Sequence, residues 1–480
     1  MKMVEKYEGY LEDVRLTEIV PHKRQLEYQK IEYYGFIHFG INTYTGKEWG
    51  TGEENPSRFN PTQLDTGQWV EVAKKGGMKG LILTCKHHDG FCLWPSAYTE
   101  HSIKNSPYKN GRGDIVKELS LACRKEGLKF GVYLSPWDMN HPSYGYGEKY
   151  NNYYLSQLTE LLTNYGEIFV VWLDGACGEG KNGKKQSYDW ERYYDKIREL
   201  QPKACIAVSG PDIRWCGNEA GDTRSSEWSV VPKELSNPEK IASDSQKDSG
   251  KEFRERRLVE QDKDLGSRSV VALKKELIWY PAEVDVSIRP GWFYHEEDDQ
   301  KVRSFENLKE IYLRSVGGNC MLLLNIPPTK EGLIHKIDKE VLVQLGDFIR
   351  NSFTYNKAKK ARIISRPQID REGNIPEVLM EEEKAYFHNP YGEREFEIEF
   401  QWEKEQVLQY FVVQEEISKS QRVEKFELYY LENNEWILYF QATTIGYKRI
   451  INLKGLNTRG VKFRITDARV CPVLSRIGIY

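Results

Sequence analysis

Two acidic residues could form the carboxylate pair on which hydrolysis of a glycosidic bond depends. Asp174 follows the apolar run of residues 168–173, and a charge at the end of such a run is costly unless a site uses it. Glu219 lies further along, in the glycine-flanked segment of residues 214–221. A retaining glycosidase uses one carboxylate as nucleophile and a second as proton donor across the bond. The alternative for Glu219 is an ordinary surface acid, because the chain has 72 Asp and Glu residues.

Three of the nine histidines also end strand-like runs, namely His38, His87 and His88. Histidines at barrel strand ends can bind zinc, so a metal-dependent barrel hydrolase is one alternative. Against it, His38 is not in a His-x-His pair, and an extended backbone would place the imidazoles of His87 and His88 on opposite sides. We interpret the histidines as hydrogen-bonding partners of sugar hydroxyls and expect no metal and no cofactor. For His88, a core histidine remains the alternative.

The elements that must position these residues alternate between strand-like and helix-like segments. Polar residues follow or end the first four strands, at His38, His87, Tyr133 and Asp174. This repeat predicts a (β/α)8-like TIM barrel with its chemistry at the carboxyl-terminal rim of the strands. A doubly wound sheet is the rival fold, but the Gly-rich loop typical of it is absent. The predicted strands are residues 35–40, 80–86, 129–134, 168–173, 204–209, 279–288 and 320–326, and the predicted helices include 115–126, 155–165, 188–200 and 339–351.

The periodicity changes towards the carboxyl terminus, where apolar and charged residues alternate. Phe396, Ile398 and Phe400 show this pattern, and Asn433-Asn434 is typical of a hairpin turn. We therefore predict a catalytic barrel over residues 1–345 and an all-β sandwich over residues 355–480. The strongly charged segment 241–268 is predicted to be a long surface excursion of the barrel.

Composition limits the function classes. The net charge is −3 with both signs interspersed, which gives no electrostatic case for nucleic acid or an anionic membrane. The eight cysteines contain no C-x-x-C pair, and the first residues contain no apolar signal-peptide core, so we expect a cytoplasmic protein unless a leader was removed. Aromatic residues make up 12% of the chain. This excess suits either a sugar-binding site or an ordinary aromatic core.

Several motifs carry a resemblance to a known family. They include Phe36-Ile-His38-Phe-Gly, Lys47-Glu48-Trp49, Lys86-His-His-Asp-Gly-Phe, Gly131-Val-Tyr133-Leu-Ser, Val171-Trp-Leu-Asp174-Gly, Ser287-Ile-Arg-Pro-Gly-Trp292 and Ser315-Val-Gly-Gly-Asn-Cys-Met. These motifs, and their order along the chain, resemble those of the α-L-fucosidases of glycoside hydrolase family 29. The resemblance implies that Asp174 is the nucleophile of a retaining, exo-acting enzyme. It also implies a set of fucose-binding residues: His38, Glu48, Trp49, His87, His88, Tyr133 and Trp292.

The segment Trp215-Cys-Gly-Asn-Glu219 resembles the branch of that family that is selective for α-1,3 and α-1,4 fucosyl linkages. In that branch the motif glutamate is the acid/base, which implies this role for Glu219. The tail resembles the branch's galactose-binding-like β-sandwich. Arg214 is a candidate for an arginine that contacts fucose in other branches. The implied partner is a fucosylated oligosaccharide or glycoconjugate, and the alternative function is a non-catalytic fucose-binding protein.

Overall fold

The computed structural model describes residues 2–239, 241, 264–369, 373–381 and 385–480. Its larger part is built on a parallel sheet of eight strands in the order β5-β4-β3-β2-β1-β10-β9-β6. The amide of Val208 donates to the carbonyl of Ile213, which joins β5 to the residue before β6 and nearly closes the sheet into a barrel. The strands are β1 Tyr33–Ile37, β2 Gly80–Lys86, β3 Lys129–Leu134, β4 Val170–Leu173, β5 Cys205–Val208, β6 Arg214–Trp215, β9 Ala282–Ser287 and β10 Cys320–Asn325.

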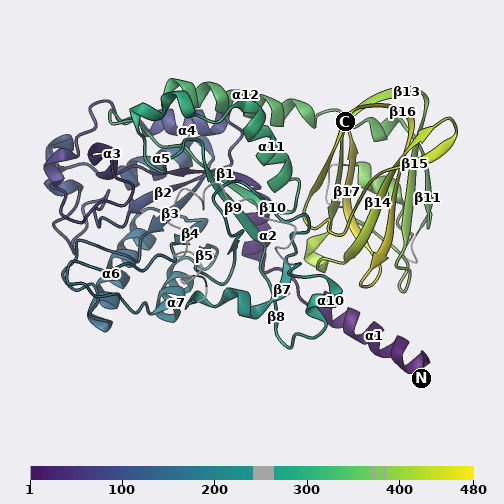
Figure 1. Ribbon diagram of the computed structural model, residues 1–480, viewed down its shortest axis with the longest axis horizontal. Helices are drawn as coiled ribbons and strands as arrows, with labels where there is room; N and C mark the ends of the chain where they lie inside the picture. The colour runs from purple at the N-terminus through teal and green to yellow at the C-terminus, as the bar shows by residue number, and fades with distance from the viewer. Residues whose placement is uncertain (1, 240, 242–263, 370–372, 382–384) are drawn as a thin grey trace.

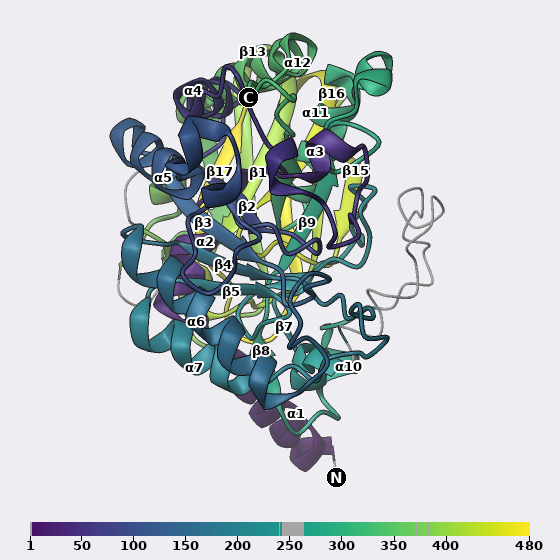
Figure 2. The same ribbon diagram turned by 90° about the vertical axis from the view of Figure 1, so that its left-hand side faces the viewer.

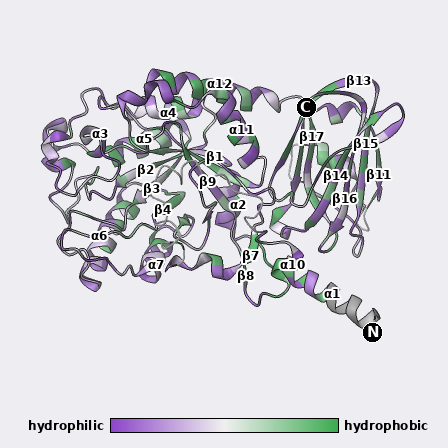
Figure 3. Cartoon of the chain, viewed as in Figure 1, coloured by the Kyte–Doolittle hydropathy of each residue, from purple (hydrophilic) through white to green (hydrophobic). Residues whose placement is uncertain are grey.

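Helices surround this sheet (Figures 1 and 2). They are α2 Lys23–Gln29, α4 Thr66–Lys75, α5 Ile115–Glu126, α6 Glu148–Asn164, α7 Trp190–Leu200, α11 Phe305–Ser315 and α12 Lys336–Ser352, with the short α3 Asn42–Thr45 and α10 Arg268–Val271 in loops. Strands such as β2 are buried along their whole length, as expected for parallel strands covered on both faces. The helices α4, α5 and α12 carry both hydrophobic and hydrophilic residues (Figure 3), because only one face of each packs on the sheet.

Local signals explain several helix boundaries. The carboxylate of Asp114 accepts a hydrogen bond from the Lys117 amide and caps α5, which ends at Gly127 in the left-handed conformation. This confirms the predicted start and end of that helix. The predicted strand 279–288 is instead two strands, the short β8 Leu277–Trp279 and β9, because β8 pairs with β7 Val230–Pro232 in a separate small sheet. The amino-terminal helix α1 Lys2–Thr17 was not predicted. Residues 242–263 of the predicted excursion lie outside the described residues.

The carboxyl-terminal part is an antiparallel β-domain with its own hydrophobic core. Its strands are β11 Arg362–Arg366, β12 Phe387–His388, β13 Phe396–Glu415, β14 Val423–Glu432, β15 Glu435–Ala442, β16 Arg449–Ala468 and β17 Val473–Ile479. Asn433 and Asn434, both with positive φ, form the hairpin turn between β14 and β15, as predicted. The long strands β13 and β16 change register between Gln401 and Gln406, so each can bend around the core.

This β-domain contacts the barrel at the amino-terminal ends of its strands. Lys448 forms an ion pair with Glu32, just before β1. The Tyr447 amide donates to the side-chain oxygen of Asn319, just before β10. The β-domain therefore packs at the end of the barrel opposite to the rim on which the predicted site lies. No helix in the described part of the chain is both long and apolar enough to cross a membrane.

Candidate active site

Asp174 follows β4 at the barrel rim, and two neighbours orient its carboxylate. The Tyr133 hydroxyl donates to Oδ2 at 3.1 Å, and the amide of Ala176 donates to Oδ1 at 2.7 Å. Burial, and then the charge of Asp174, raise the pKa of Tyr133 well above its usual range, so the phenol remains a donor. The Asp174 side chain is partly exposed, which leaves the carboxylate accessible from the mouth of the barrel.

His88 stands next to this carboxylate, with Nε2 3.8 Å from Oδ2 of Asp174. Its Nδ1 lies 2.7 Å from Oγ of Ser135, and that hydroxyl donates to the carbonyl of Trp137. Because the serine proton is used there, Nδ1 of His88 carries the hydrogen and Nε2 is free to accept one. Burial lowers the pKa of His88 despite the opposing charge of Asp174. The ring is therefore a neutral acceptor beside the carboxylate.

The rings of His87 and His88 lie on the same side of the backbone, with centroids 4.2 Å apart. The prediction that they point to opposite sides was wrong. The reason is that β2 ends at Lys86 and the chain turns, with the amide of Gly90 donating to the carbonyl of His87. His87 also stacks against Tyr133 at 5.7 Å, and burial lowers its pKa well below the usual range. Among the described residues, no group of three or more His, Cys, Asp or Glu side chains could hold a metal ion.

His38 lies beside His87 and packs against the Trp292 indole at 4.9 Å between ring centroids. Its Nδ1 is 2.9 Å from Oδ1 of Asn325. The amide nitrogen of Asn325 donates to the Ser287 hydroxyl and to the Trp292 carbonyl, so its oxygen must face His38. His38 therefore donates through Nδ1 and offers Nε2 as an acceptor. Burial lowers the pKa of His38 to about 3.

Trp292 is held in a loop after β9 that leans on Glu48. One Glu48 oxygen accepts from the Trp292 amide at 2.8 Å, and the other lies 2.8 Å from Nε2 of His295. A side chain at Gly291 would meet this carboxylate at 2.4 Å, so Glu48 would have to move away from its partners. Arg289 anchors the same loop by an ion pair with Asp338 of α12. The hydrogen bond that His295 donates to Glu48 raises the pKa of His295.

The loop after β6 carries Glu219, and the preceding residues shape it. Gly217 adopts φ +104°, a conformation that strains any residue with a side chain. The buried Asn218 accepts hydrogen bonds from the amides of Ala220 and Asp222. The turn fixed in this way presents Glu219 to the mouth, where the Trp292 indole N–H donates to Oε2 at 3.2 Å. The Gly-Asn-Glu sequence thus has a structural reason at each position.

Trp49 forms part of the outer edge of the mouth. Its ring lies 6.4 Å from His88 and 5.8 Å from Trp137, centroid to centroid, and the residue is 44% exposed. An exposed indole beside a group of hydrogen-bonding side chains is suited to cover the apolar face of a sugar.

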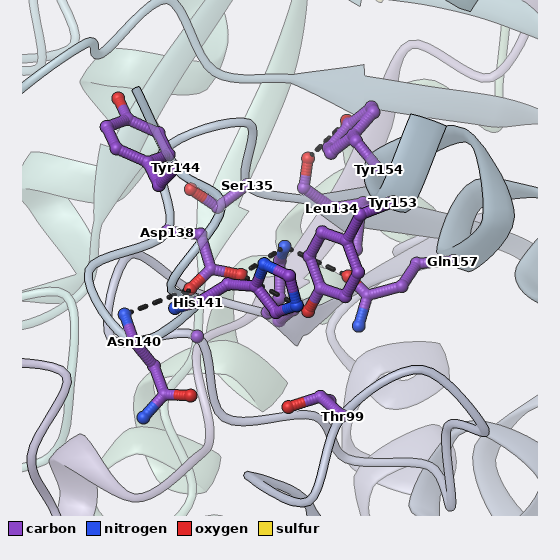
Figure 4. A network of polar contacts seen from close by, with 12 residues as sticks. Thr99, Leu134, Ser135, Asp138, Asn140, His141, Tyr144, Tyr153, Tyr154 and Gln157 are labelled. Carbon is purple, nitrogen blue, oxygen red and sulfur yellow. Dashed lines mark hydrogen bonds and ion pairs between the residues drawn. The ribbon is translucent and has the colours of Figure 1, made fainter. Parts of the chain in front are cut away.

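Behind the histidines, a buried ion pair ties the loops after β2 and β3 together. Lys86 donates to Asp138 and to Gln157 at 3.0 Å each. The other oxygen of Asp138 accepts from the amides of Asn140 and His141, and His141 stacks on Tyr153 at 3.6 Å (Figure 4). Burial alone would raise the pKa of Asp138, but Lys86 and these hydrogen bonds bring it below its usual value. The pair fixes the backbone beside His87.

The structure does not bring Arg214 to this group. Neighbouring residues of a strand point to opposite faces, and Trp215 points into the barrel, where it packs in the interior cluster. Arg214 is buried on the other side, and donates to Glu227 at 2.6 Å and to the carbonyls of Tyr280 and Trp228. Its guanidinium is thus paired within the barrel wall, and the expectation of a contact from this arginine to fucose does not agree with its position. The other predicted site residues all lie in the mouth.

Several residues that contact the site were not predicted from the sequence. Asn325 and Ser135 set the histidine tautomers, His295 pairs with Glu48, and Asp285 on β9 accepts from the Trp215 indole at 2.6 Å. One signal was present for Asp285. The β9 sequence Ala-Glu-Val-Asp-Val-Ser places acidic residues at alternate positions of an apolar strand, which directs them to one face.

Comparison with known proteins agrees with this geometry. The family profile described as Alpha-L-fucosidase matches residues 5–352. The chain belongs to the α-L-fucosidases of glycoside hydrolase family 29. Alpha-L-fucosidase 1 of Arabidopsis thaliana is 40% identical over 96% of this chain and 87% of its own. A Ruminococcus gnavus fucosidase of family 29 in complex with fucose is 30% identical, with a TM-score of 0.83, over 96% of this chain and 95% of its own.

A family 29 member from a rumen bacterium is also similar, with 38% identity and a TM-score of 0.78 over 96% of this chain and 77% of the other. As an α-L-fucosidase of a retaining family, the protein takes a substrate that contains fucose. The site at the carboxyl-terminal rim of the barrel combines aromatic rings with hydrogen-bonding side chains, and both kinds of group suit a sugar.

The Asn325–His38 contact gives a first prediction. In Asn325→Ala, Nδ1 of His38 loses its acceptor, so the ring can take the other tautomer and present a donor instead of an acceptor at Nε2. We expect kcat/KM to fall about tenfold, since one hydrogen bond is worth about 1 kcal/mol or slightly more. Asn325→Asp keeps the acceptor but stabilises the imidazolium, so its activity should fall at acidic pH. Unchanged kcat/KM in a folded Asn325→Ala enzyme would contradict this assignment.

Proposed function

We propose that the protein is a retaining, exo-acting α-L-fucosidase that releases L-fucose from α-1,3- and α-1,4-fucosylated, Lewis-type glycans. In this proposal Asp174 is the nucleophile and Glu219 the acid/base. The main support is the position of Asp174, a carboxylate at the barrel rim that Tyr133 and the Ala176 amide orient and that remains partly exposed.

The proposed reaction has two steps. A carboxylate oxygen of Asp174 attacks the anomeric carbon while the bond from that carbon to the leaving oxygen breaks, and Glu219 gives its proton to this oxygen. Water then attacks the anomeric carbon, Glu219 takes a proton from it, and the bond to Asp174 breaks. Tyr133 stabilises the Asp174 carboxylate in the resting enzyme through its hydroxyl.

The remaining residues of the mouth would bind the sugar. His38 and His88 offer an acceptor nitrogen each, as derived above from Asn325 and Ser135. Glu48 and His87 add further polar groups, and the rings of Trp49 and Trp292 would cover the apolar face and the methyl group of fucose. Neutral imidazoles suit neutral hydroxyls, which agrees with the lowered pKa values of the three histidines.

Linkage preference is the part of the proposal that the Glu219 loop supports. In a Lewis-type glycan the neighbouring galactose folds against the fucose, and a pocket for it would add binding energy remote from the cleaved bond. If that galactose helps to close the Glu219 loop, the energy raises turnover as well as affinity.

We therefore expect kcat/KM for a Lewis-a or Lewis-x trisaccharide to exceed that for 2'-fucosyllactose by about tenfold or more. The measurement is release of free fucose from the two substrates at equal concentration. Equal values, or a preference for the α-1,2 linkage, would contradict the linkage proposal but not the fucosidase activity. Tight binding of both glycans with no release of fucose would favour a non-catalytic fucose-binding protein.

A further inference from the structure

Strand β9 places two further carboxyl groups inside the barrel, on Glu283 and on Asp285. Val284 and Val286 pack in the cluster between sheet and helices, whereas Glu283 accepts from the interior Trp172 indole. Since side chains alternate along a strand, Asp285 also faces inwards, one step nearer the rim than Glu283. Asp285 is only 4% exposed, and the two-step reaction proposed above gives it no role.

The backbone brings Glu219 to the same face of β9. Ala220 forms an antiparallel bridge with Val286. In such a bridge the residues on either side of the pair point to the opposite face from the pair itself. Val286 points outwards, so Glu219 points into the barrel together with Asp285. The contact of Glu219 with the Trp292 indole, which packs in the interior cluster, agrees with this orientation.

An indole N–H contacts each of these two carboxyl groups. The Trp215 indole donates to Oδ1 of Asp285 at 2.6 Å, and the Trp292 indole donates to Oε2 of Glu219 at 3.2 Å. Burial, and then the charge of Glu219, raise the pKa of Asp285 well above its usual range. The charge of Glu283 on the same strand raises this pKa further. A buried carboxyl group and a half-buried one that face each other in this way do not both ionise readily.

We propose that Asp285 is a positioning residue that holds one proton jointly with Glu219 and so keeps the acid/base carboxyl protonated at neutral pH. This inference rests on the proposed acid/base role of Glu219. In the first step the shared proton leaves from Glu219 to the glycosidic oxygen. Both carboxylates are then charged, which makes Glu219 a stronger base towards the incoming water. The proton returns from that water, and the pair regains its starting charge.

The test is the pH profile of kcat/KM for Asp285→Asn on a fucosylated oligosaccharide. Asparagine keeps an oxygen for the Trp215 indole but removes the charge. We expect the alkaline limb to move to lower pH by about one unit, so that activity on that limb falls about tenfold. An aryl fucoside whose leaving group needs no protonation should show no such movement. Glu297→Ala removes the charge of an exposed acid on the same rim, so its alkaline limb should stay in place.

The outcomes separate this inference from the function on which it rests. An unmoved alkaline limb in folded Asp285→Asn, or equal movement with both substrates, would overturn the role of Asp285 alone. Full oligosaccharide activity in Glu219→Gln would overturn the acid/base assignment instead.

If the Asp285→Asn variant does not fold, Asp285→Ser removes the same charge with a smaller side chain. In the unmodified enzyme, the infrared band of a protonated carboxyl group should titrate along the alkaline limb, and a band that does not would also count against the proposal.

Discussion

Asp174→Ala should lose about 10³-fold or more in kcat on any fucoside, because the covalent step has no nucleophile. The substitution also removes the acceptor of the Tyr133 hydroxyl, but that hydroxyl faces the partly exposed mouth and can bind water. We therefore expect the variant to stay folded and to bind fucose. Steady-state rates on an aryl fucoside, with thermal unfolding measured in parallel, test both expectations.

Added azide should restore part of this activity and identify the role of Asp174 by the product. Azide would enter from the face that the nucleophile has vacated and give the β-fucosyl azide, whereas the unmodified enzyme releases the α-anomer of fucose first. Glu179→Ala is the matched control, since Glu179 is an exposed acid in the same loop and should be dispensable. Near-normal turnover in Asp174→Ala would contradict the assignment of Asp174 as the nucleophile.

The parts of the fold that follow from local sequence were predicted well. The cap at Asp114 and the glycine at 127 set the bounds of α5, and the apolar runs 80–86 and 129–134 became β2 and β3 without change. These signals lie within the element itself, so no distant part of the chain can alter them easily. For the same reason the strand-end position of Asp174 was visible in the sequence.

What sequence did not show depends on contacts between distant segments. The orientation of Arg214 is set by the pairing of the two-residue strand β6 with β9, and no periodicity can be read from two residues. The shared side of His87 and His88 depends on a turn after Lys86, and the histidine tautomers depend on Asn325 and Ser135. The position of Asp285 beside Glu219 depends on the bridge between the Glu219 loop and β9.

The second large effect is expected for Glu219→Ala, and its size should depend on the leaving group. A glycan leaving group needs a proton, so kcat/KM on a Lewis-type trisaccharide should fall about 10²–10⁴-fold. An aryl fucoside with a good leaving group does not need it, so its first step should be nearly unaffected. Its second step lacks the base that activates water. The fucosyl-enzyme should then accumulate, with a burst of phenol, a low KM and a low kcat.

Azide again separates the two roles, because here it attacks the accumulated fucosyl-enzyme rather than the substrate. The expected product is the α-fucosyl azide, the opposite anomer to that from Asp174→Ala.

Loss of the Trp292 indole contact is a side effect of the substitution. The informative comparison is therefore Trp292→Phe, which removes the same hydrogen bond but keeps the carboxyl group. It should lower activity on both substrates without producing a burst. Glu297→Ala removes an exposed acid on the same rim and should leave the activity on both substrates unchanged. Equal losses on the glycan and the aryl fucoside, without a burst, would show that Glu219 shapes the mouth but does not transfer the proton.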